Sequence, residues 1–283
     1  MNSTSVSEHT MMLIISVFKK IILADFSTRN SLWNYRNNYE PRELYGKNLL
    51  IIGFGRIGKK LGKLAKAFGM NIHVYDPYIE NKFDEYEIRH FQNLTTALCN
   101  ADCISLNLPK VDKPIITKEN SQYLKHGVVI INTARGELIE EKVLKDGIQE
   151  GIISGVGLDV FDSEPVEKNH FLFKYKQVIF TPHQAGLSQE AAQRMSIKSI
   201  NNILDYYDGS LDSSLISSSL TVSSMAFIRF FRISALVSIV DLKESFKSSI
   251  KYSCETLSLI FFVTSDISSD ISSQEFLFEF STS

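Results

Sequence analysis

Between residues 46 and 185 the chain alternates short apolar runs with segments of helical periodicity, and this alternation constrains the fold more than any other feature. The helical segments include 58–68 and 140–150. Each apolar run is typical of a strand in a sheet that is covered on both faces. Strands that alternate with helices predict right-handed crossovers and therefore an α/β fold with a doubly wound parallel sheet. The predicted strands are NLLIIGF, NIHVYD, DCISLNL, VVIIN, ISGVGLDV and QVIFTP.

The sequence GFGRIG at 53–58 follows the first predicted strand and opens a helix, as the pattern G-x-G-x-x-G requires of a Rossmann-type fold. Gly53 would allow the tight turn, Gly55 a close approach to a pyrophosphate, and Gly58 close packing of helix against strand. The backbone N–H groups of Arg56 and Ile57 would face the phosphate at the positive helix end. The alternative is a glycine-rich turn with only a structural role.

Asp76 ends the second apolar run, 18 residues after Gly58. A carboxylate at this place accepts hydrogen bonds from ribose hydroxyls and repels the extra phosphate of NADP. The sequence therefore predicts NAD as the cofactor. Asp76 also precedes Pro77, and an Asp in that position can simply initiate a turn.

Composition excludes several classes of protein. The 283 residues are enough for one or two domains, and a net charge of −2 shows no excess of basic residues that would indicate nucleic-acid binding. The three cysteines, Cys99, Cys103 and Cys254, are too few and wrongly spaced for a zinc site or a disulfide framework. We therefore expect no metal and a reducing compartment, the cytoplasm.

Two apolar stretches resemble membrane or targeting segments. The first, residues 11–23, contains two lysines, is too short to span a bilayer, and lacks the flanks of a signal peptide, so it predicts an amphipathic helix. The second, residues 225–240, carries two arginines near its centre and is also shorter than a spanning helix. We expect no membrane insertion by either stretch.

All prolines and glycines lie at or before Gly209, and residues 210–283 are rich in serine. Glycine and proline supply the backbone angles that turns need, so this part has little turn chemistry. The predicted organisation is a crossover helix and linker at 1–45, a dinucleotide-binding domain at 46–186, a return helix at 187–210, and an atypical C-terminal extension of unknown role at 211–283.

Three further motifs follow predicted strands: NTARGEL at 132–138, GLDVFDSEP at 157–165 and TPHQAG at 181–186. Together with GFGRIG they resemble the D-isomer-specific 2-hydroxyacid dehydrogenases, which include D-3-phosphoglycerate, glycerate, formate and D-lactate dehydrogenases. The resemblance extends over residues 7–211 and includes EHTMMLIIS, LNLP and RMSIKSINNILDYYDG. It implies hydride transfer between NAD(H) and a small 2-hydroxy or 2-oxo acid, 3-phosphoglycerate being one candidate.

The resemblance also implies residue roles. Arg135 would bind the substrate carboxylate, His183 would be the general acid/base, and Glu164 would partner the histidine. Asp159 would contact the nicotinamide carboxamide region. The remaining implied cofactor contacts are Leu108 and Pro109 at the adenosine ribose, with Thr133, Ala134, Arg135, His183 and Gly186 around the nicotinamide.

These residue types suit the chemistry. Oxidation of a 2-hydroxy acid removes a hydride from C2 and a proton from the hydroxyl, so a base must lie within hydrogen-bond reach of that oxygen. Histidine suits this task near neutral pH, and a neighbouring carboxylate stabilises its charged form. Arginine offers a planar, permanently charged fork for a carboxylate. Taken singly, Arg135, Glu164 and His183 could instead be a surface ion-pair former, a solvated loop acid and a turn residue.

The resemblance sets two further expectations. Family members carry a substrate lobe of about one hundred residues, mostly ahead of the cofactor domain, whereas this chain begins almost at the crossover helix, so we expect most of that lobe to be missing. An NAD(H)-binding module without turnover and an inactive truncated fragment are therefore alternatives to an active dehydrogenase. The helix that begins EHTMMLIIS implies a homodimer. The other histidines have no partner motif and are expected to be structural or surface residues: His9, His73, His90, His126 and His170.

Overall fold

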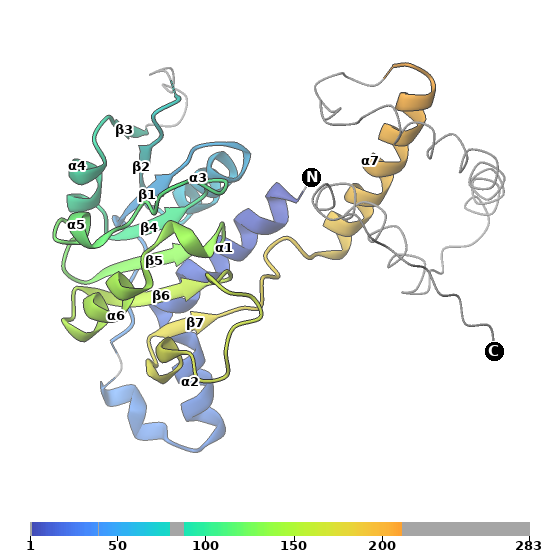
Figure 1. The fold of residues 1–283 in the computed structure, drawn as a ribbon. Coiled ribbons are helices and arrows are strands. Elements are labelled where there is room, and N and C mark those ends of the chain that lie inside the picture. The colour runs from blue at the N-terminus through green and yellow to red at the C-terminus, as the bar shows by residue number, and fades with distance from the viewer. Residues whose placement is uncertain (1, 39, 80–87, 211–283) are drawn as a thin grey trace. The chain divides into compact units, whose positions relative to one another are not determined.

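The computed structural model describes residues 2–38, 40–79 and 88–210 (Figure 1). These residues fall into two units divided within the last helix, between Arg194 and Met195. The serine-rich extension predicted at 211–283 and the apolar stretch at 225–240 lie outside the described residues. The first unit contains the predicted dinucleotide-binding region.

The first unit is built on a seven-stranded sheet in the order β3-β2-β1-β4-β5-β6-β7, in which every neighbouring pair is parallel. This confirms the predicted fold class. All six predicted strands are present, and the sequence did not indicate β3 because it is short and has no continuous apolar run. The strands are β1 Asn48–Ile52, β2 Asn71–Tyr75, β3 Arg89–Phe91, β4 Cys103–Leu106, β5 Val128–Asn132, β6 Ile153–Leu158 and β7 Val178–Phe180.

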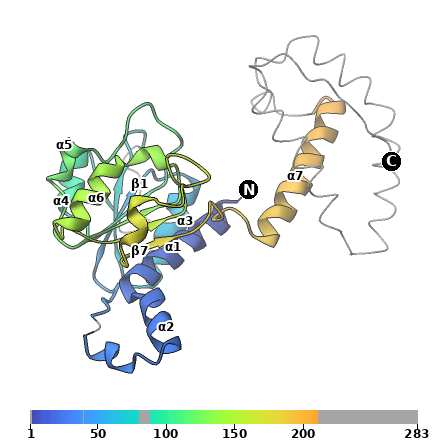
Figure 2. The ribbon, with the colours of Figure 1, turned by 60° about the horizontal axis from the view of Figure 1, so that its bottom comes forward.

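Helices cover both faces of the sheet. In both views α4 to α6 lie on one face, and α1 and α3 lie side by side on the other (Figures 1 and 2). The predicted helices at 58–68 and 140–150 are present as α3 and α6, and α7 lies within the return helix predicted at 187–210. The helices are α1 Ser3–Lys19, α2 Ile21–Arg29, α3 Arg56–Ala67, α4 Leu94–Cys99, α5 Lys118–Ser121, α6 Glu141–Gln149 and α7 Gln189–Tyr207; short 3-10 helices are η1 Trp33–Asn38, η3 Gly136–Leu138 and η4 Phe171–Lys174.

The central strands are apolar on both sides because successive side chains of a strand point to opposite faces. In β1, Leu50 and Ile52 join the core under α4 and α6, whereas Leu49 and Ile51 join the core under α1 and α3. All four side chains are fully buried. A continuous apolar run is thus what a strand between two helical layers needs.

The helix predicted over residues 11–23 is interrupted. Helix α1 ends at Lys19, and Lys20 adopts a left-handed conformation with φ 50°, after which α2 begins. The backbone N–H of Lys20 donates to the carbonyls of Ser16 and Val17, which closes the end of α1. The apolar pattern is helical on both sides of the break, so periodicity alone did not reveal it.

Helix α1 packs directly on the sheet where β6 carries glycine. A Cβ atom added at Gly155 would lie 2.4 Å from Cγ1 of Val17, and one added at Gly157 would lie 3.2 Å from Cβ of Leu13. The missing side chains let the helix approach the strand closely. This contact fixes the start of α1, with its polar residues, near the carboxyl ends of β5, β6 and β7.

Candidate functional site

The carboxyl ends of β1 and β4 are adjacent, and the connections from these two strands lead to opposite faces of the sheet. Such a switch point is where parallel α/β sheets bind ligands. Gly53 follows β1 with φ 89°, and a Cβ atom added there would lie 2.7 Å from both the carbonyl oxygen of Asn107 and Cδ2 of Leu108. The turn after β1 therefore needs glycine, and Leu108 lies against it, with Pro109 exposed beside it.

The start of α3 forms a cradle at this switch point. Gly55 is the N-cap residue and makes no side-chain cap hydrogen bond, so the N–H groups that open the helix, including those of Arg56 and Ile57, lack a side-chain cap. A Cβ atom added at Gly55 would meet nothing within 4 Å, whereas one added at Gly58 would lie 2.4 Å from the carbonyl oxygen of Gly53. The cradle thus has open space at Gly55 and tight packing at Gly58, as a pyrophosphate site requires.

The surroundings of these two glycines predict different effects of an alanine substitution, one on stability and the other on NADH binding. Gly58→Ala should lower the free energy of unfolding by about 1–3 kcal/mol because its Cβ would overlap a backbone carbonyl, although alanine favours helices. Gly55→Ala should leave stability nearly unchanged but weaken NADH binding about 10- to 100-fold, since its Cβ occupies the phosphate space. Thermal melting and NADH titration of both variants check this, and equal effects on stability would contradict it.

Asp76 lies at the end of β2, beside the glycine turn. Its Oδ2 accepts a hydrogen bond from the backbone N–H of Phe54 at 2.8 Å, and its Oδ1 accepts one from Tyr78 N–H at 3.0 Å. The side chain is partly buried. Both interpretations of Asp76 are compatible with this geometry, because the carboxylate organises its own turn and also lies beside the glycine turn of the cradle. The buried Oδ1 of Asn107, which the sequence analysis missed, has no hydrogen-bond partner in the described residues and lies at the same switch point.

The NTARG motif forms a turn at the end of β5. The buried side chain of Asn132 accepts from Ala134 N–H at 3.1 Å and donates to the carbonyl of Arg135 at 2.7 Å. Thr133 and Ala134 are almost fully buried, whereas Arg135 is exposed and its Nη1 donates to the carbonyl of Ala134 at 2.6 Å. Asn132 therefore shapes the turn that presents Arg135, a contribution not recognised from the sequence.

Gly136 brings this turn against the loop that carries Glu164. A Cβ atom added at Gly136 would lie 2.1 Å from the carbonyl carbon of Phe161 and 2.4 Å from the backbone nitrogen of Asp162. Backbone atoms on both sides leave no room for a side chain, so only glycine fits. The contact holds the loops after β5 and β6 together.

His183 and Glu164 form an ion-pair geometry beyond the ends of β6 and β7, with His183 Nδ1 lying 2.6 Å from Glu164 Oε2. Glu164 Oε1 accepts from Phe161 N–H at 3.0 Å. Burial raises the pKa of Glu164, but the bonds from His183 and Phe161 and the charges of His183 and Arg135 outweigh it, and the pKa is lowered. Glu164 is thus a carboxylate at neutral pH, and the three predicted catalytic residues share one electrostatic neighbourhood.

The backbone of His183 is held in an uncommon conformation with φ 51°. Such a conformation costs free energy in a residue with a side chain and often marks a functional site. Its N–H donates to the carbonyl of Asp159 at 2.9 Å, and the Asp159 carboxylate accepts from Gln184 N–H at 2.9 Å and Ala185 N–H at 2.8 Å. The loop that presents His183 is therefore tied to the end of β6.

Asp159, predicted as a nicotinamide contact, is fully buried, and its carboxylate is engaged by the 181–185 loop. Gly186, predicted near the same ring, lies beside the start of α1, where an added Cβ would be 2.9 Å from Nδ2 of Asn2. Hydrogen bonds therefore join Asp159, at the end of β6, to the 181–185 loop that carries His183, and Gly186 directly follows that loop. Their cofactor contacts remain predictions.

Three residues of α1 contact the loops after β5 and β7, and they were not identified as site residues from the sequence. Ser5 Oγ donates to the carbonyl of Ala185 at 2.8 Å, His9 Nε2 lies 3.0 Å from Thr181 Oγ1, and Thr10 Oγ1 lies 2.8 Å from Thr133 Oγ1. Residues of one helical face recur every three or four positions. Ser5 and His9 are four positions apart, which was the available signal, but only the fold shows what this face contacts.

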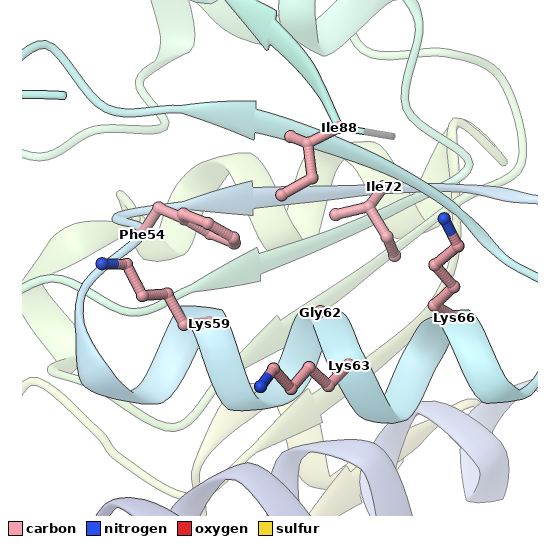
Figure 3. Close-up of a pocket in the computed structure, with 7 residues that line it drawn as sticks. All are labelled: Phe54, Lys59, Gly62, Lys63, Lys66, Ile72 and Ile88. Carbon is pink, nitrogen blue, oxygen red and sulfur yellow. The ribbon is translucent and has the colours of Figure 1, made fainter. Parts of the chain in front are cut away.

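Two hollows among the described residues lie away from this constellation. One has a volume of about 10 Å³. It lies between α3 and the sheet and is bordered by Phe54 and by lysines of α3 (Figure 3). A larger one, about 390 Å³, includes Tyr45, His73 and Arg89 and lies toward the amino ends of β1 and β2. Ligands of parallel sheets bind at the carboxyl ends, so the strand-end geometry identifies the candidate site better than cavity size does.

Two searches of the described residues bear on other kinds of site. No group of three or more histidine, cysteine, aspartate or glutamate side chains in residues 2–38, 40–79 and 88–210 is arranged to hold a metal ion. Within the same ranges no helix has the length and apolar character needed to cross a bilayer.

The parallel sheet, the glycine cradle and the strand-end acid together define a dinucleotide-binding Rossmann domain. Residues 11–185 match the family model described as D-isomer specific 2-hydroxyacid dehydrogenase, NAD binding domain. Because the match takes in more than half of the chain, the chain belongs to this family. NAD is accordingly the cofactor of this domain, and the open cradle at Gly55 and the acid at Asp76 fit it.

Relatives and solved structures agree with this placement. D-3-Phosphoglycerate dehydrogenase of Bacillus subtilis is 35% identical over 210 residues, covering 74% of this chain and 40% of the relative. That of Methanocaldococcus jannaschii is 42% identical over 196 residues, covering 68% of this chain and 37% of the relative. The structure of D-lactate dehydrogenase from Aquifex aeolicus, complexed with NAD and lactic acid, has a TM-score of 0.67 at 28% identity, covering 74% of this chain and 67% of that chain. The chain thus spans about two fifths of the length of these phosphoglycerate dehydrogenases.

Proposed function

We propose that the chain catalyses hydride transfer between NAD(H) and a 2-hydroxy or 2-oxo acid, with His183 as general acid/base, Glu164 as its partner and Arg135 as the carboxylate anchor. The observation that carries the proposal is the 2.6 Å contact between His183 Nδ1 and Glu164 Oε2, on the same sheet edge as the glycine cradle. Two titratable groups paired this way beside a cofactor site are typical of acid/base catalysis.

The hydrogen bond assigns a role to each ring nitrogen of His183. Because Glu164 is a carboxylate, it accepts from Nδ1–H, which leaves Nε2 of the neutral ring as the acceptor for the substrate hydroxyl proton. During oxidation the proton would move to Nε2, and Glu164 would stabilise the imidazolium formed. During reduction Nε2–H would return the proton to the substrate oxygen.

Arg135 would bind the substrate carboxylate through its planar guanidinium group. It is exposed at the end of β5, and only one contact of its guanidinium, Nη1 to the Ala134 carbonyl, is a hydrogen bond to the protein in the described residues. The other nitrogens can therefore meet a ligand. Such an anchor would hold C2 toward the nicotinamide.

For the cofactor we propose the residues of the cradle and of the strand ends. The α3 N-terminus at Gly55, Arg56, Ile57 and Gly58 would hold the pyrophosphate, and Asp76 the adenosine ribose. NAD, when bound, supplies or accepts the hydride. The remaining proposed contacts are Gly53, Leu108, Pro109, Thr133, Ala134, Arg135, Asp159, His183 and Gly186.

The first substrate to test is 3-phosphoglycerate, since D-3-phosphoglycerate dehydrogenases of two organisms are among the relatives. A relative named glyoxylate reductase, from Aeropyrum pernix, is 29% identical over 219 residues, covering 75% of this chain and 65% of that relative. A panel should therefore include glyoxylate, pyruvate and the 2-oxo acid that corresponds to 3-phosphoglycerate. Tight NADH binding without turnover of any of them would favour the alternative, a binding module.

A homodimer is supported by apolar side chains that α2 and the following segment expose. Ile22 and Phe26 are 57% exposed and Trp33 is 65% exposed, and clustered exposure of this kind marks interaction surfaces. Phe26→Arg is expected to halve the mass from twice 32.1 kDa to that of one chain, because a charge cannot be buried there unpaired. Light scattering after gel filtration checks this, with exposed Tyr123→Arg as the control. A wild-type monomer would contradict the dimer.

The compartment and the domain limits remain proposals. Among the described residues Cys99 and Cys103 are free, and an exposed free thiol such as Cys99 suits a reducing cytoplasm. Formation of a disulfide by this chain in cells would contradict that assignment. We retain the limits 1–45, 46–186, 187–210 and 211–283, which limited proteolysis can test: cleavage within 46–186 before the other parts would contradict them.

A further inference from the structure

One face of α1 holds two of the loops that present the proposed catalytic residues, the loop of Arg135 and the loop of His183. Ser5 binds the carbonyl of Ala185 and His9 contacts Thr181, so both act on the loop of His183. Thr10 contacts Thr133, two residues before Arg135. Thr10 and Asp159 are fully buried, and the His9 side chain is only 12% exposed. These contacts are therefore built into the interior and are not surface contacts.

Hydrogen-bond accounting determines which proton His9 carries. Thr181 Oγ1 has a single proton and lies 2.5 Å from the carboxylate oxygen Oδ1 of Asp159, which can only accept. The hydroxyl of Thr181 therefore donates to Asp159 and must accept from His9. It follows that His9 carries its proton on Nε2, at 3.0 Å from Thr181 Oγ1.

This arrangement forms a directed chain from α1 to the loop of His183. His9 Nε2–H donates to Thr181, Thr181 donates to Asp159, and Asp159 accepts the N–H groups of Gln184 and Ala185 on the far side of His183. Burial lowers the pKa of His9, and the nearby charge of Asp159, 3.5 Å away, opposes that effect. A neutral His9 suits the donor role, because this series of hydrogen bonds requires a single ring proton, the one on Nε2.

We propose that His9 is a positioning residue for His183: by donating from Nε2 to Thr181 it fixes the Asp159 network that sets the backbone of the 181–185 loop. His183 needs such support because its φ of 51° is unfavourable for a residue with a side chain. The kinetic consequence rests on the proposed dehydrogenase function, whereas the structural consequence does not.

The amide of glutamine provides a matched test, because its Nε2–H can donate to Thr181 while leucine cannot. His9→Leu is expected to lower kcat about 10-fold with little change in the KM for NADH, since a small misplacement of a catalytic group is costly. His9→Gln should recover most of kcat. His126→Leu, at an exposed histidine away from the site, serves as the control and should leave both parameters unchanged.

A readout without turnover uses the full chain with isotope-labelled histidine in nuclear magnetic resonance. In the wild-type protein His9 should be the Nε2–H tautomer, and the ring resonances of His183 should move in His9→Leu but not in His126→Leu. A wild-type Nδ1–H tautomer overturns the proposal, and so do unchanged His183 resonances and kcat in folded His9→Leu. If the wild-type chain has no turnover, the proposed function fails. The tautomer of His9 in the wild-type protein still tests the role of His9, because that measurement needs neither turnover nor a folded variant.

Discussion

Replacing His183 by alanine is expected to lower kcat for reduction of a 2-oxo acid by about 10²–10⁴-fold, the range typical of losing a general acid/base. The affinity for NADH should fall far less than kcat, because the cradle at Gly55 and the acid Asp76, at the ends of β1 and β2, stay intact. Steady-state kinetics of the wild-type protein and of His183→Ala measure the loss of kcat, and NADH titration of both measures the change in cofactor affinity.

Glu164→Gln is the informative companion to that substitution. Glutamine can still accept from Nδ1–H but carries no charge to stabilise the imidazolium, so kcat should fall by less than in His183→Ala. His126→Ala, at an exposed histidine, should retain wild-type kcat. Full activity of His183→Ala with the best substrate of the panel would contradict the assignment of His183 as acid/base.

Replacing Arg135 by leucine is expected to lower kcat/KM by about 10²-fold, because a charge-assisted carboxylate contact contributes about 1.5–3 kcal/mol. Arg135→Lys should recover only part of the loss, since an ammonium group cannot make the paired planar contact. Stability should be unaffected, because the side chain is exposed and, among the described residues, its hydrogen bond is to the carbonyl of the neighbouring Ala134. An unchanged KM for the 2-oxo acid in both variants would exclude Arg135 as the anchor.

The fold class could be predicted from the sequence because the features that determine it are local in the chain. An apolar run such as VVIIN indicates a strand that is covered on both faces, as β5 is. The pattern G-x-G-x-x-G indicates a tight turn, and the three glycines that this turn needs lie within six residues of the chain. The partnership of Glu164 with His183 was implied by the family resemblance, and in the structure His183 Nδ1 lies 2.6 Å from Glu164 Oε2.

What the sequence did not predict depends on contacts between distant segments. The break at Lys20 is a single left-handed residue within a continuous apolar pattern. The contact of His9 with Thr181 joins residues far apart in the chain, and no local periodicity encodes it. The fit of Gly136 against Phe161 likewise depends on how two strand-end loops meet. Such features follow from the packing of α1 and of the loops on the sheet.

The most direct test of the central claim is 2-oxo-acid-dependent oxidation of NADH by the full chain, followed by loss of NADH absorbance across the substrate panel, with NADPH in parallel. We predict turnover with at least one 2-oxo acid, faster with NADH than with NADPH because Asp76 disfavours the extra phosphate. Tight NADH binding with no oxidation by any member of the panel would contradict the claim that Arg135, Glu164 and His183 form a working dehydrogenase site.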